Sequence, residues 1–294
     1  MKESIGLIGI GLVGTALAEN ILGSGFDVLG YDIVASKLTN LERLGGKVAT
    51  SPREVASRTS RIILSLLDSE VVTEVIEGAD GVIRAENLPQ YIIDTTTGDP
   101  EKTEAIARKL LKKGVHYLDA TISGSSEQIR KGEGVFMIGG PKEAFEACED
   151  IFSSLAKRYF FIGPSGSGSK AKLASNLILG LNRLVLAEGL VFAEKLGLDL
   201  ESFLSLLKMT PAYSCAMDVK GRKMIEGDFR PQSRITQHDK DLEIILKYAE
   251  KEGQELPLAQ AHKKILEDAI SFGEGELDTS AVIKQIKRLA RQKK

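Results

Sequence analysis

The feature that most constrains the fold is a glycine-rich turn close to the start of the chain. Its pattern, G-x-G-x-x-G, is made by Gly9, Ile10, Gly11, Leu12, Val13 and Gly14. The turn directly follows an apolar run and directly precedes a helical pattern. In that context the first glycine allows a tight turn, the second lets the backbone approach a pyrophosphate, and the third permits close packing of helix on strand. The hexapeptide alone could be a flexible turn, but its setting predicts a dinucleotide-binding unit.

A carboxylate at the end of the next strand completes this pattern. Asp32 lies 18 residues beyond Gly14 and ends the run Val28–Tyr31. A carboxylate there can accept hydrogen bonds from the ribose hydroxyls and would repel the extra phosphate of NADP. The sequence therefore favours NAD as the cofactor. Ser36 and Lys37 follow closely, so use of NADP stays open.

The first half of the chain alternates short β-branched runs with helical patterns. The strands that we expect are 5–9, 28–31, 62–66, 91–94, 116–119, 135–138 and 159–162. Helices are expected between them, for example over 15–22, 36–44 and 101–113, because apolar residues recur there every three or four positions. This alternation predicts an α/β fold, a doubly wound parallel Rossmann sheet.

After Gly163 the pattern becomes helical. A Gly/Ser-rich hinge, GPSGSGSK, is followed by a long apolar-periodic stretch over 169–196, which Gly197 closes. Further helices are expected over 200–208, 239–252, 258–270 and 279–291, with no convincing strand. We therefore divide the chain into a nucleotide-binding sheet domain, residues 1–163, and an all-helical substrate and dimerisation domain, residues 164–294.

Composition narrows the class of protein. The net charge is −2 and 43% of residues are hydrophobic, so neither disorder nor a nucleic-acid or membrane-surface partner is expected. The basic stretch 284–294 is interpreted as a solvated helix end. We expect no apolar stretch to reach the roughly 18 residues that span a bilayer, and the start lacks a signal-peptide pattern. Cys148 and Cys215 lack the spacing of a metal site, so we expect no bound metal. We interpret both as reduced thiols and expect the protein in the cytoplasm.

Two polar clusters are candidates for chemistry. The first is 119–125, at the carboxyl end of a predicted strand, where ligands of such sheets bind. There the Ser123 hydroxyl and the backbone around Gly124 form a plausible cradle for a carboxylate, although the cluster could also be a polar turn. We predict that Ser123, Gly124 and Ser125 bind the substrate.

The second cluster lies on the long helix. Lys172 and Asn176 are four positions apart, so their side chains share one helix face. An amine can donate a proton to a developing alkoxide, or accept one from an alcohol when it is deprotonated. By numbers alone a solvated lysine would be the default, but a cation near a helix N-terminus is mildly unfavourable. Lys172 is therefore predicted to be the catalytic acid/base, assisted by Asn176.

Together these blocks resemble the 3-hydroxyisobutyrate dehydrogenase-like β-hydroxyacid dehydrogenases, relatives of 6-phosphogluconate dehydrogenase. The resemblance covers nearly the whole chain. It rests on GLIGIGLVG at 6–14, DTTTGDP at 94–100, DATISGS at 119–125 and GSGSKAKLASN at 166–176, with Lys240-Asp241-Leu242 as a fifth block.

The resemblance implies roles for individual residues. It implies a Rossmann domain joined to a helical domain, with the active site between them. Thr97 would contact the cofactor near the nicotinamide, Leu66 would line its passage and Lys240 would close over it. It also agrees with Lys172 as acid/base and with Asn176 as a residue that positions the substrate.

This chain departs from the family pattern beside the predicted carboxylate cradle. Thr121 and Ile122 replace a proline and a valine, and Ser125 replaces a second glycine. The residues that follow, 126–128, are also unusual, and Glu127 could repel a second carboxylate or bind a hydroxyl or amine. These departures leave the identity of the substrate open.

The sequence thus predicts an NAD-dependent oxidoreductase that acts on a small 3-hydroxy acid. Two alternatives stay open: a reductase of short aldehydes such as glyoxylate or succinic semialdehyde, and a non-catalytic NAD-binding or chromatin-associated module. An imine reductase is less attractive because a lysine stands at the acid/base position. The long helix is apolar around its circumference over 177–192, so we expect a homodimer or homotetramer.

Overall fold

The computed structural model describes residues 3–291 and divides into two compact units. The first extends to Lys172 and the second begins at Leu173. The predicted basic stretch 284–294 continues into residues 292–294, which lie outside the described residues. The helix that begins at Ser167 contains the boundary between the units, and the predicted boundary at 163/164 stays a prediction.

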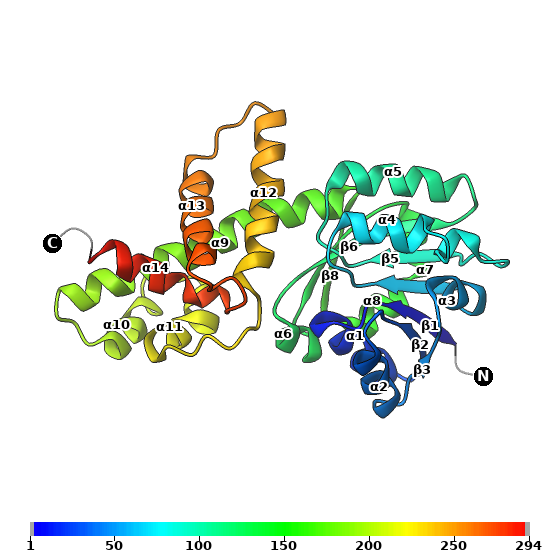
Figure 1. Ribbon diagram of the computed structural model, residues 1–294, viewed down its shortest axis with the longest axis horizontal. Coiled ribbons are helices and arrows are strands. Elements are labelled where there is room, and N and C mark those ends of the chain that lie inside the picture. The colour runs from blue at the N-terminus through cyan, green and yellow to red at the C-terminus, as the bar shows by residue number, and fades with distance from the viewer. Residues whose placement is uncertain (1–2, 292–294) are drawn as a thin grey trace. The chain divides into compact units, whose positions relative to one another are not determined.

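The first unit is built on one eight-stranded sheet with strand order β3-β2-β1-β4-β5-β6-β7-β8 (Figure 1). Its strands are β1 Ser4–Ile8, β2 Asp27–Tyr31, β3 Lys47–Val48, β4 Arg61–Leu64, β5 Tyr91–Asp94, β6 His116–Ser123, β7 Val135–Gly139 and β8 Arg158–Gly163. All seven predicted strands are present. The strand that sequence reasoning missed, β3, is a two-residue edge strand too short to show a periodic pattern.

The predicted parallel sheet is parallel except at β7, which runs antiparallel to β6. A parallel crossover needs about a dozen or more residues, usually including a full helix. Only residues 124–134 join these two strands, and they contain one short helix, α6 Ser126–Arg130. β6 also continues to Ser123, so Asp119 and Thr121 are strand residues. The alternative that they belong to a polar turn is therefore wrong.

Helices cover both faces of the sheet, as the doubly wound pattern predicts. The helices of this unit are α1 Leu12–Gly23, α2 Ala35–Arg43, α3 Pro52–Arg58, α4 Ser69–Glu77, the short 3-10 helix Val82–Arg84, α5 Pro100–Leu111, α6 Ser126–Arg130, α7 Lys142–Ala147 and α8 Glu149–Leu155. One apolar core contains α1, α7 and α8, and the other contains α3, α4 and α5. Alternation along β1 sends Ile5 and Leu7 into the first core and Ile8 into the second.

The second unit is helical. Its elements are the remainder of α9 Ser167–Lys195, α10 Leu200–Leu207, the π-helical turn Met217–Gly221, α11 Arg222–Glu226, α12 Ile235–Lys251, α13 Pro257–Ser271, the 3-10 turn Thr279–Ala281 and α14 Val282–Leu289. One isolated bridge joins Arg234 and Asp278. Helices α12 and α13 lie side by side (Figure 1). The helix predicted over 279–291 is shorter in the structure: it begins as the 3-10 turn Thr279–Ala281 and continues as α14 to Leu289.

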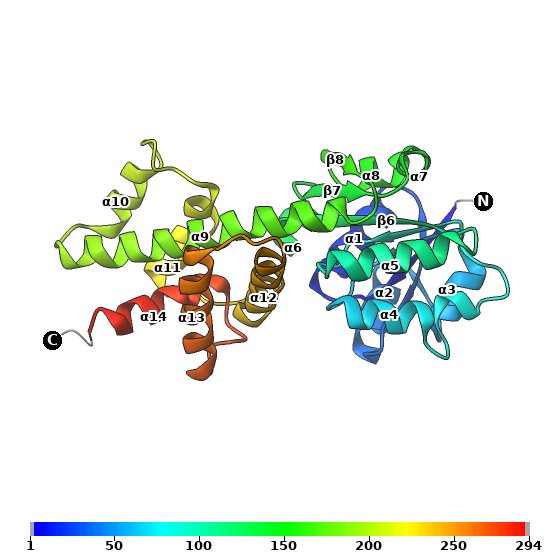
Figure 2. The same cartoon turned by 90° about the horizontal axis from the view of Figure 1, so that it is seen from above.

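The long helix α9 is continuous over 29 residues (Figure 2). Among the described residues it is the one helix long and apolar enough to cross a bilayer, and half of its most apolar window is buried inside the protein. The expectation that no stretch reaches this length is therefore wrong. The core helix of a globular protein passes the same test, and α9 carries Arg183 in a buried polar network.

That network is centred on Arg183 and two histidines of the second unit. The guanidinium donates to Thr279 Oγ1 at 2.9 Å and lies 3.3 Å from His238 Nδ1. The rings of His238 and His262 are 5.1 Å apart. Burial lowers the pKa of Arg183 to about 10, and burial together with Arg183 lowers the pKa of His262 to about 4. Neutral His262 thus packs beside a buried cation whose guanidinium is bonded to protein groups.

Candidate active site

The glycine-rich turn joins β1 to α1 with almost no free space around two of its glycines. Gly9 has φ +94°, which favours glycine, and its N–H donates to Tyr31 O at 2.9 Å. A Cβ on Gly14 would lie 2.0 Å from the carbonyl oxygen of Gly9. Gly14 therefore lets α1 pack directly against the end of β1, as predicted for the third glycine of the motif.

The second glycine serves a different purpose. Gly11 has φ −72°, which any residue can adopt, and a Cβ added there would meet no atom within 4 Å. It is the N-cap of α1, and no side chain caps the first turn of that helix. Uncapped N–H groups beside open space fit a bound pyrophosphate. Within the hexapeptide, Ile10 is buried in the core and Leu12 is exposed.

Asp32 braces this turn from the end of β2. One carboxylate oxygen accepts from the N–H of Ile10 at 2.6 Å, and the other accepts from the N–H of Val34 at 2.9 Å. Each oxygen has further acceptor capacity. The predicted cofactor carboxylate is therefore held next to the glycine-rich turn by two backbone donors, and it is partly exposed.

The loops that carry Leu66 and Thr97 are joined to each other. Leu66 N–H donates to Thr96 Oγ1 at 3.1 Å, and Thr96 N–H donates to Asp94 Oδ1 at 2.9 Å. The Tyr117 hydroxyl donates to the other oxygen of Asp94. Leu66, predicted to line the nicotinamide passage, and Thr97, predicted to contact the cofactor, thus sit on loops that Thr96 connects and Asp94 anchors.

Asp94 should make the protein less stable as the pH rises. Burial raises its pKa to about 6, against the hydrogen bonds from Thr96 and Tyr117. The unfolded chain releases this proton near pH 3.8, so the folded state binds more protons between pH 3.8 and 6, and stability falls across that window. In Asp94→Asn the amide can still accept from Thr96 and donate to Tyr117. The variant lacks this titration. The free energy of unfolding of the variant minus that of the wild type should therefore be about 2–3 kcal/mol larger at pH 8 than at pH 4.

Urea unfolding at the two pH values measures this difference. Asp80→Asn is the matched control because Asp80 is largely exposed. If Asp94→Asn and Asp80→Asn changed the free energy of unfolding by the same amount at pH 4 and at pH 8, the assignment to Asp94 would be contradicted.

The predicted substrate loop follows β6, and its last residue caps a helix. Ser125 Oγ accepts from Gln128 N–H at 3.3 Å, and Gln128 Oε1 accepts from Ser125 N–H at 2.9 Å. This capping box starts α6. Glu127 pairs with Lys131 at 3.0 Å, and its side chain is about half exposed. Both Ser125 and Glu127 therefore have partners within the protein.

Asp119 anchors the helix that carries Lys172. Its carboxylate oxygens accept from the N–H groups of Gly166 at 2.9 Å and of Ser169 at 2.8 Å. Thr121 Oγ1 donates to Gly168 O at 2.9 Å. Burial raises the pKa of Asp119, while these backbone donors lower it. The first turn of α9 is thus bonded to β6, the strand that ends at Ser123.

Lys172 lies one turn further along this anchored helix and is 7% exposed. It is therefore not the solvated lysine that its sequence position alone would suggest. Gly168 approaches β6 so closely that a Cβ would lie 2.3 Å from Asp119 O. Residues four positions apart share a helix face, so Lys172 lies on the face of α9 that Gly168 packs on β6.

Asn176 and Lys240 belong to the second unit. Asn176 Nδ2 donates to Asp241 Oδ2 at 3.0 Å, and both residues are buried. Lys240, on α12, lies 3.7 Å from the Asp241 carboxylate. Asp241, for which the sequence predicts no role of its own, therefore holds Asn176. Within residues 3–291, no cluster of three or more His, Cys, Asp or Glu side chains is arranged to hold a metal ion.

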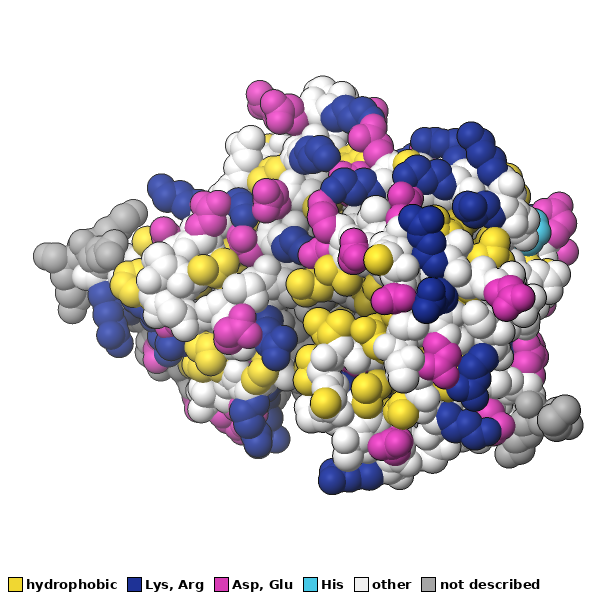
Figure 3. Space-filling model, turned by 45° about the vertical axis from the view of Figure 1, so that its right-hand side comes forward, with side chains coloured by type: hydrophobic (Ala, Val, Ile, Leu, Met, Phe, Trp, Pro, Cys, Tyr) yellow, Lys and Arg dark blue, Asp and Glu magenta, His cyan; other side chains and the backbone are white. Residues whose placement is uncertain are grey.

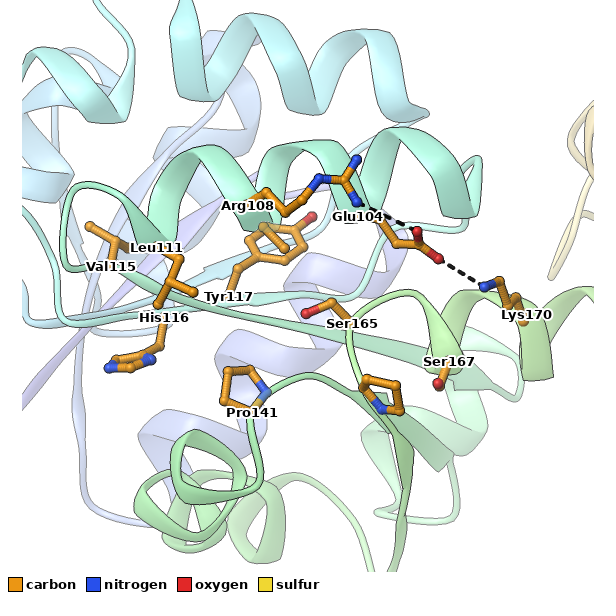
Figure 4. A pocket seen from close by; sticks show the side chains of 12 residues that line it. Glu104, Arg108, Leu111, Val115, His116, Tyr117, Pro141, Ser165, Ser167 and Lys170 are labelled. Carbon is orange, nitrogen blue, oxygen red and sulfur yellow. Dashed lines mark hydrogen bonds and ion pairs between the residues drawn. The ribbon is translucent and has the colours of Figure 1, made fainter.

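A separate cavity of about 370 Å³ lies in the first unit, and none of the predicted site residues lines it. Figure 4 shows Glu104 between Arg108 and Lys170, and all three residues line this cavity. Glu104 lies 2.8 Å from Lys170 and 3.7 Å from Arg108, so this ion-pair cluster joins α5 to the first turn of α9. Because the lysine and the arginine are each more than half exposed, this cluster adds little to the anchoring of that helix by Asp119.

Comparison with known proteins decides the family. Residues 4–163 match the NAD-binding domain of 6-phosphogluconate dehydrogenase, and residues 166–286 match the NAD-binding domain of NADP-dependent 3-hydroxyisobutyrate dehydrogenase. The chain belongs to the 3-hydroxyisobutyrate dehydrogenase-like family. The predicted family, its two-part fold and its class, NAD(P)-dependent dehydrogenases acting on CH–OH groups, are confirmed at this level.

Individual members differ in what they do. The chain is 30% identical to glyoxylate/succinic semialdehyde reductase 1 of Arabidopsis thaliana, over 96% of its own length and 98% of the relative's. It resembles a crystal structure of 3-hydroxyisobutyrate dehydrogenase from Salmonella typhimurium with a TM-score of 0.88 and 26% identity, covering 96% of this chain and 99% of that one. It is also 32% identical, over 90% of its length, to the cytokine-like nuclear factor N-PAC of Aedes aegypti, but spans only 47% of that protein.

Proposed function

We propose that this protein is an NAD-dependent dehydrogenase of a small 3-hydroxy acid similar to 3-hydroxyisobutyrate, with Lys172 as the general acid/base. The observation that carries the proposal is the burial of Lys172 on a helix whose first turn is bonded to β6, the strand of the predicted substrate loop. This arrangement ties an amine and a carboxylate-binding loop to one rigid strand within the first unit.

Each residue then has a defined task. Ser123 and Gly124 hold the substrate carboxylate, and Asn176 orients the hydroxyl. In oxidation, neutral Lys172 takes the hydroxyl proton at Nζ; in reduction, the ammonium returns it to the developing alkoxide. When bound, the nicotinamide accepts or supplies the hydride. Gly9, Gly11, Gly14 and Asp32 hold the dinucleotide. Thr97 contacts it near the nicotinamide, Leu66 lines its passage and Lys240 closes over it.

The preference for NAD rests on the surroundings of Asp32. Its carboxylate would repel a ribose phosphate, and the next two residues, Ile33 and Val34, are exposed and apolar, so neither supplies a cation. We expect NADH to bind more tightly than NADPH in a fluorescence titration. Tighter binding of NADPH would contradict this part of the proposal.

A substrate panel tests the reaction itself. 3-Hydroxyisobutyrate, other short hydroxy acids, glyoxylate and succinic semialdehyde are each followed by NADH absorbance. Aldehyde reduction is the second candidate, supported by the likeness to the Arabidopsis reductase, and would give the highest kcat/KM with succinic semialdehyde or glyoxylate. No turnover of any compound, with NADH binding retained, would favour a non-catalytic NAD-binding module.

We also propose a homo-oligomer formed through the second unit. Ile178, Val185 and Phe192 on α9 recur every seven residues and are each more than 60% exposed. A stripe of this spacing is typical of helix–helix packing. On the face drawn in Figure 3, side chains of both charges are interspersed, which supports a small-molecule ligand more than a polyanion. Both cysteines are free thiols, in keeping with the proposed cytoplasmic location.

Val185→Glu should dissociate this oligomer. A carboxylate at the centre of the stripe would be buried without a partner if the helices packed together. Light scattering at working concentration should give a dimer or tetramer for the wild type and a monomer for the variant. Leu258→Glu, at an exposed leucine of α13 outside this stripe, is the control and should keep the wild-type mass. A monomeric wild type would refute the oligomer.

A further inference from the structure

The capping box at the start of α6 determines how the predicted substrate loop is held. Gln128 Oε1 accepts a hydrogen bond from the N–H of Ser125. The Ser125 hydroxyl oxygen accepts one from the N–H of Gln128. Gly124 has φ +147°, and a Cβ there would lie 3.6 Å from Gln128 Cβ and 3.4 Å from Gly134 Cα. The side chain of Gln128 thus packs behind Gly124 and bonds to the residue after it.

The far side of α6 is equally restrained. Asn20 Nδ2 donates to Ile129 O at 2.7 Å, and Glu19 pairs with Arg130 at 2.5 Å. Asn20 and Glu19 both belong to α1, the helix that starts at the glycine-rich turn. The predicted substrate loop is therefore followed by α6, a short helix that is bonded to α1. Gln128 connects the loop to α6.

The neutrality of Gln128 is informative. Glutamate and glutamine can both close a capping box, because either offers an oxygen to the N-cap N–H. Only glutamate would bring a negative charge next to the loop that is proposed to bind the substrate carboxylate. The neighbouring charges are already paired, Glu127 with Lys131 and Arg130 with Glu19. A carboxylate at position 128 would therefore have no cation of its own on α6.

We propose that Gln128 is a positioning residue for the substrate carboxylate. It takes the N–H of Ser125 out of ligand binding, leaves Ser123 and Gly124 as the carboxylate-binding groups, and keeps that position free of negative charge. The proposal rests on the proposed function, since it presupposes an acid substrate at this loop. It makes Gln128 a determinant of selectivity for a single small carboxylate.

Gln128→Glu separates position from charge. The variant keeps the capping box, so thermal unfolding and the Kd for NADH should match the wild type. The KM for 3-hydroxyisobutyrate should rise about tenfold, because two like charges then lie close together. The KM for its uncharged methyl ester should change less than about twofold, so the ratio of kcat/KM for acid over ester should fall about tenfold. Gln128→Ala removes the hydrogen bond from the Ser125 N–H to the side chain. It should raise both KM values about fivefold, which corresponds to the roughly 1 kcal/mol that one helix cap contributes.

Gln254→Glu is the matched control, since it makes the same exchange at an exposed site and should leave the acid-to-ester ratio unchanged. An unaltered ratio in a folded Gln128→Glu variant would overturn the assignment, and so would an equal rise in both KM values. Failure of the wild type to oxidise the acid would instead overturn the proposed function, and this assignment with it. Turnover by the wild type therefore tells the two failures apart.

Discussion

Lys172→Ala should lower kcat for the best substrate of the panel by about 10²–10⁴-fold, the usual cost of removing a general acid/base. The variant should still bind NADH with the wild-type Kd, because the glycine-rich turn and Asp32 do not involve Lys172. A pH profile adds a second readout. The rate of the wild type should vary with the protonation of the amine, and the residual rate of the variant should lose that dependence. Steady-state kinetics from pH 6 to pH 10 measure both effects.

Lys170→Ala is the control for this experiment. Lys170 lies on the same turn of α9, but it is 57% exposed and pairs with Glu104 at the surface. An exposed ion pair is worth about 0–1 kcal/mol, so activity should stay close to that of the wild type. If Lys172→Ala kept near wild-type turnover, Lys172 would not be the acid/base. If both variants lost activity equally, the effect would come from the helix and not from the amine.

The geometry of the glycine-rich turn could be predicted from the sequence alone. Gly9, Gly14 and Asp32 are contiguous with a strand and a helix that a periodic pattern reveals, so their geometry follows from local rules. The structure confirms the close approach at Gly14 and adds that Asp32 accepts from Ile10. The helical character of the second unit was equally readable, because long amphipathic periods need no knowledge of their partners.

Long-range hydrogen bonds could not be predicted. Asp119 accepts from residues 47 and 50 positions away, and no local pattern indicates that it anchors α9. The pairs Tyr117–Asp94 and Asn176–Asp241 depend in the same way on which elements pack together. The antiparallel course of β7 was missed because direction is set by the connection to β6 and not by the composition of the strand.

One missed feature did leave a signal in the sequence. Ser125-Ser126-Glu127-Gln128 fits S-x-x-Q, the pattern of a capping box, and so predicts both the start of α6 and the bond from Ser125 to Gln128. Ser125 is also predicted to bind the substrate. Its hydroxyl and N–H are both engaged by Gln128, which reduces what Ser125 can offer a ligand.

Gly11→Ala and Gly14→Ala should separate cofactor binding from folding. A methyl group at Gly11 meets no protein atom and suits the local φ of −72°, so the free energy of unfolding should fall by less than about 1 kcal/mol. The same methyl would occupy the space expected for the pyrophosphate. An overlap that costs about 1–3 kcal/mol corresponds to NADH binding weakened roughly 5- to 150-fold.

Gly14→Ala should behave in the opposite order. Its Cβ would lie 2.0 Å from Gly9 O, a backbone atom that cannot rotate away, so the strand end and α1 must separate. We expect the free energy of unfolding to fall by about 1–3 kcal/mol or more, measured in urea without cofactor, with weaker NADH binding as a consequence. Because the two glycines lie three residues apart in one turn, each variant controls for the other. Equal destabilisation by both would mean that Gly11 serves the fold, and the open space beside it would no longer argue for a bound dinucleotide.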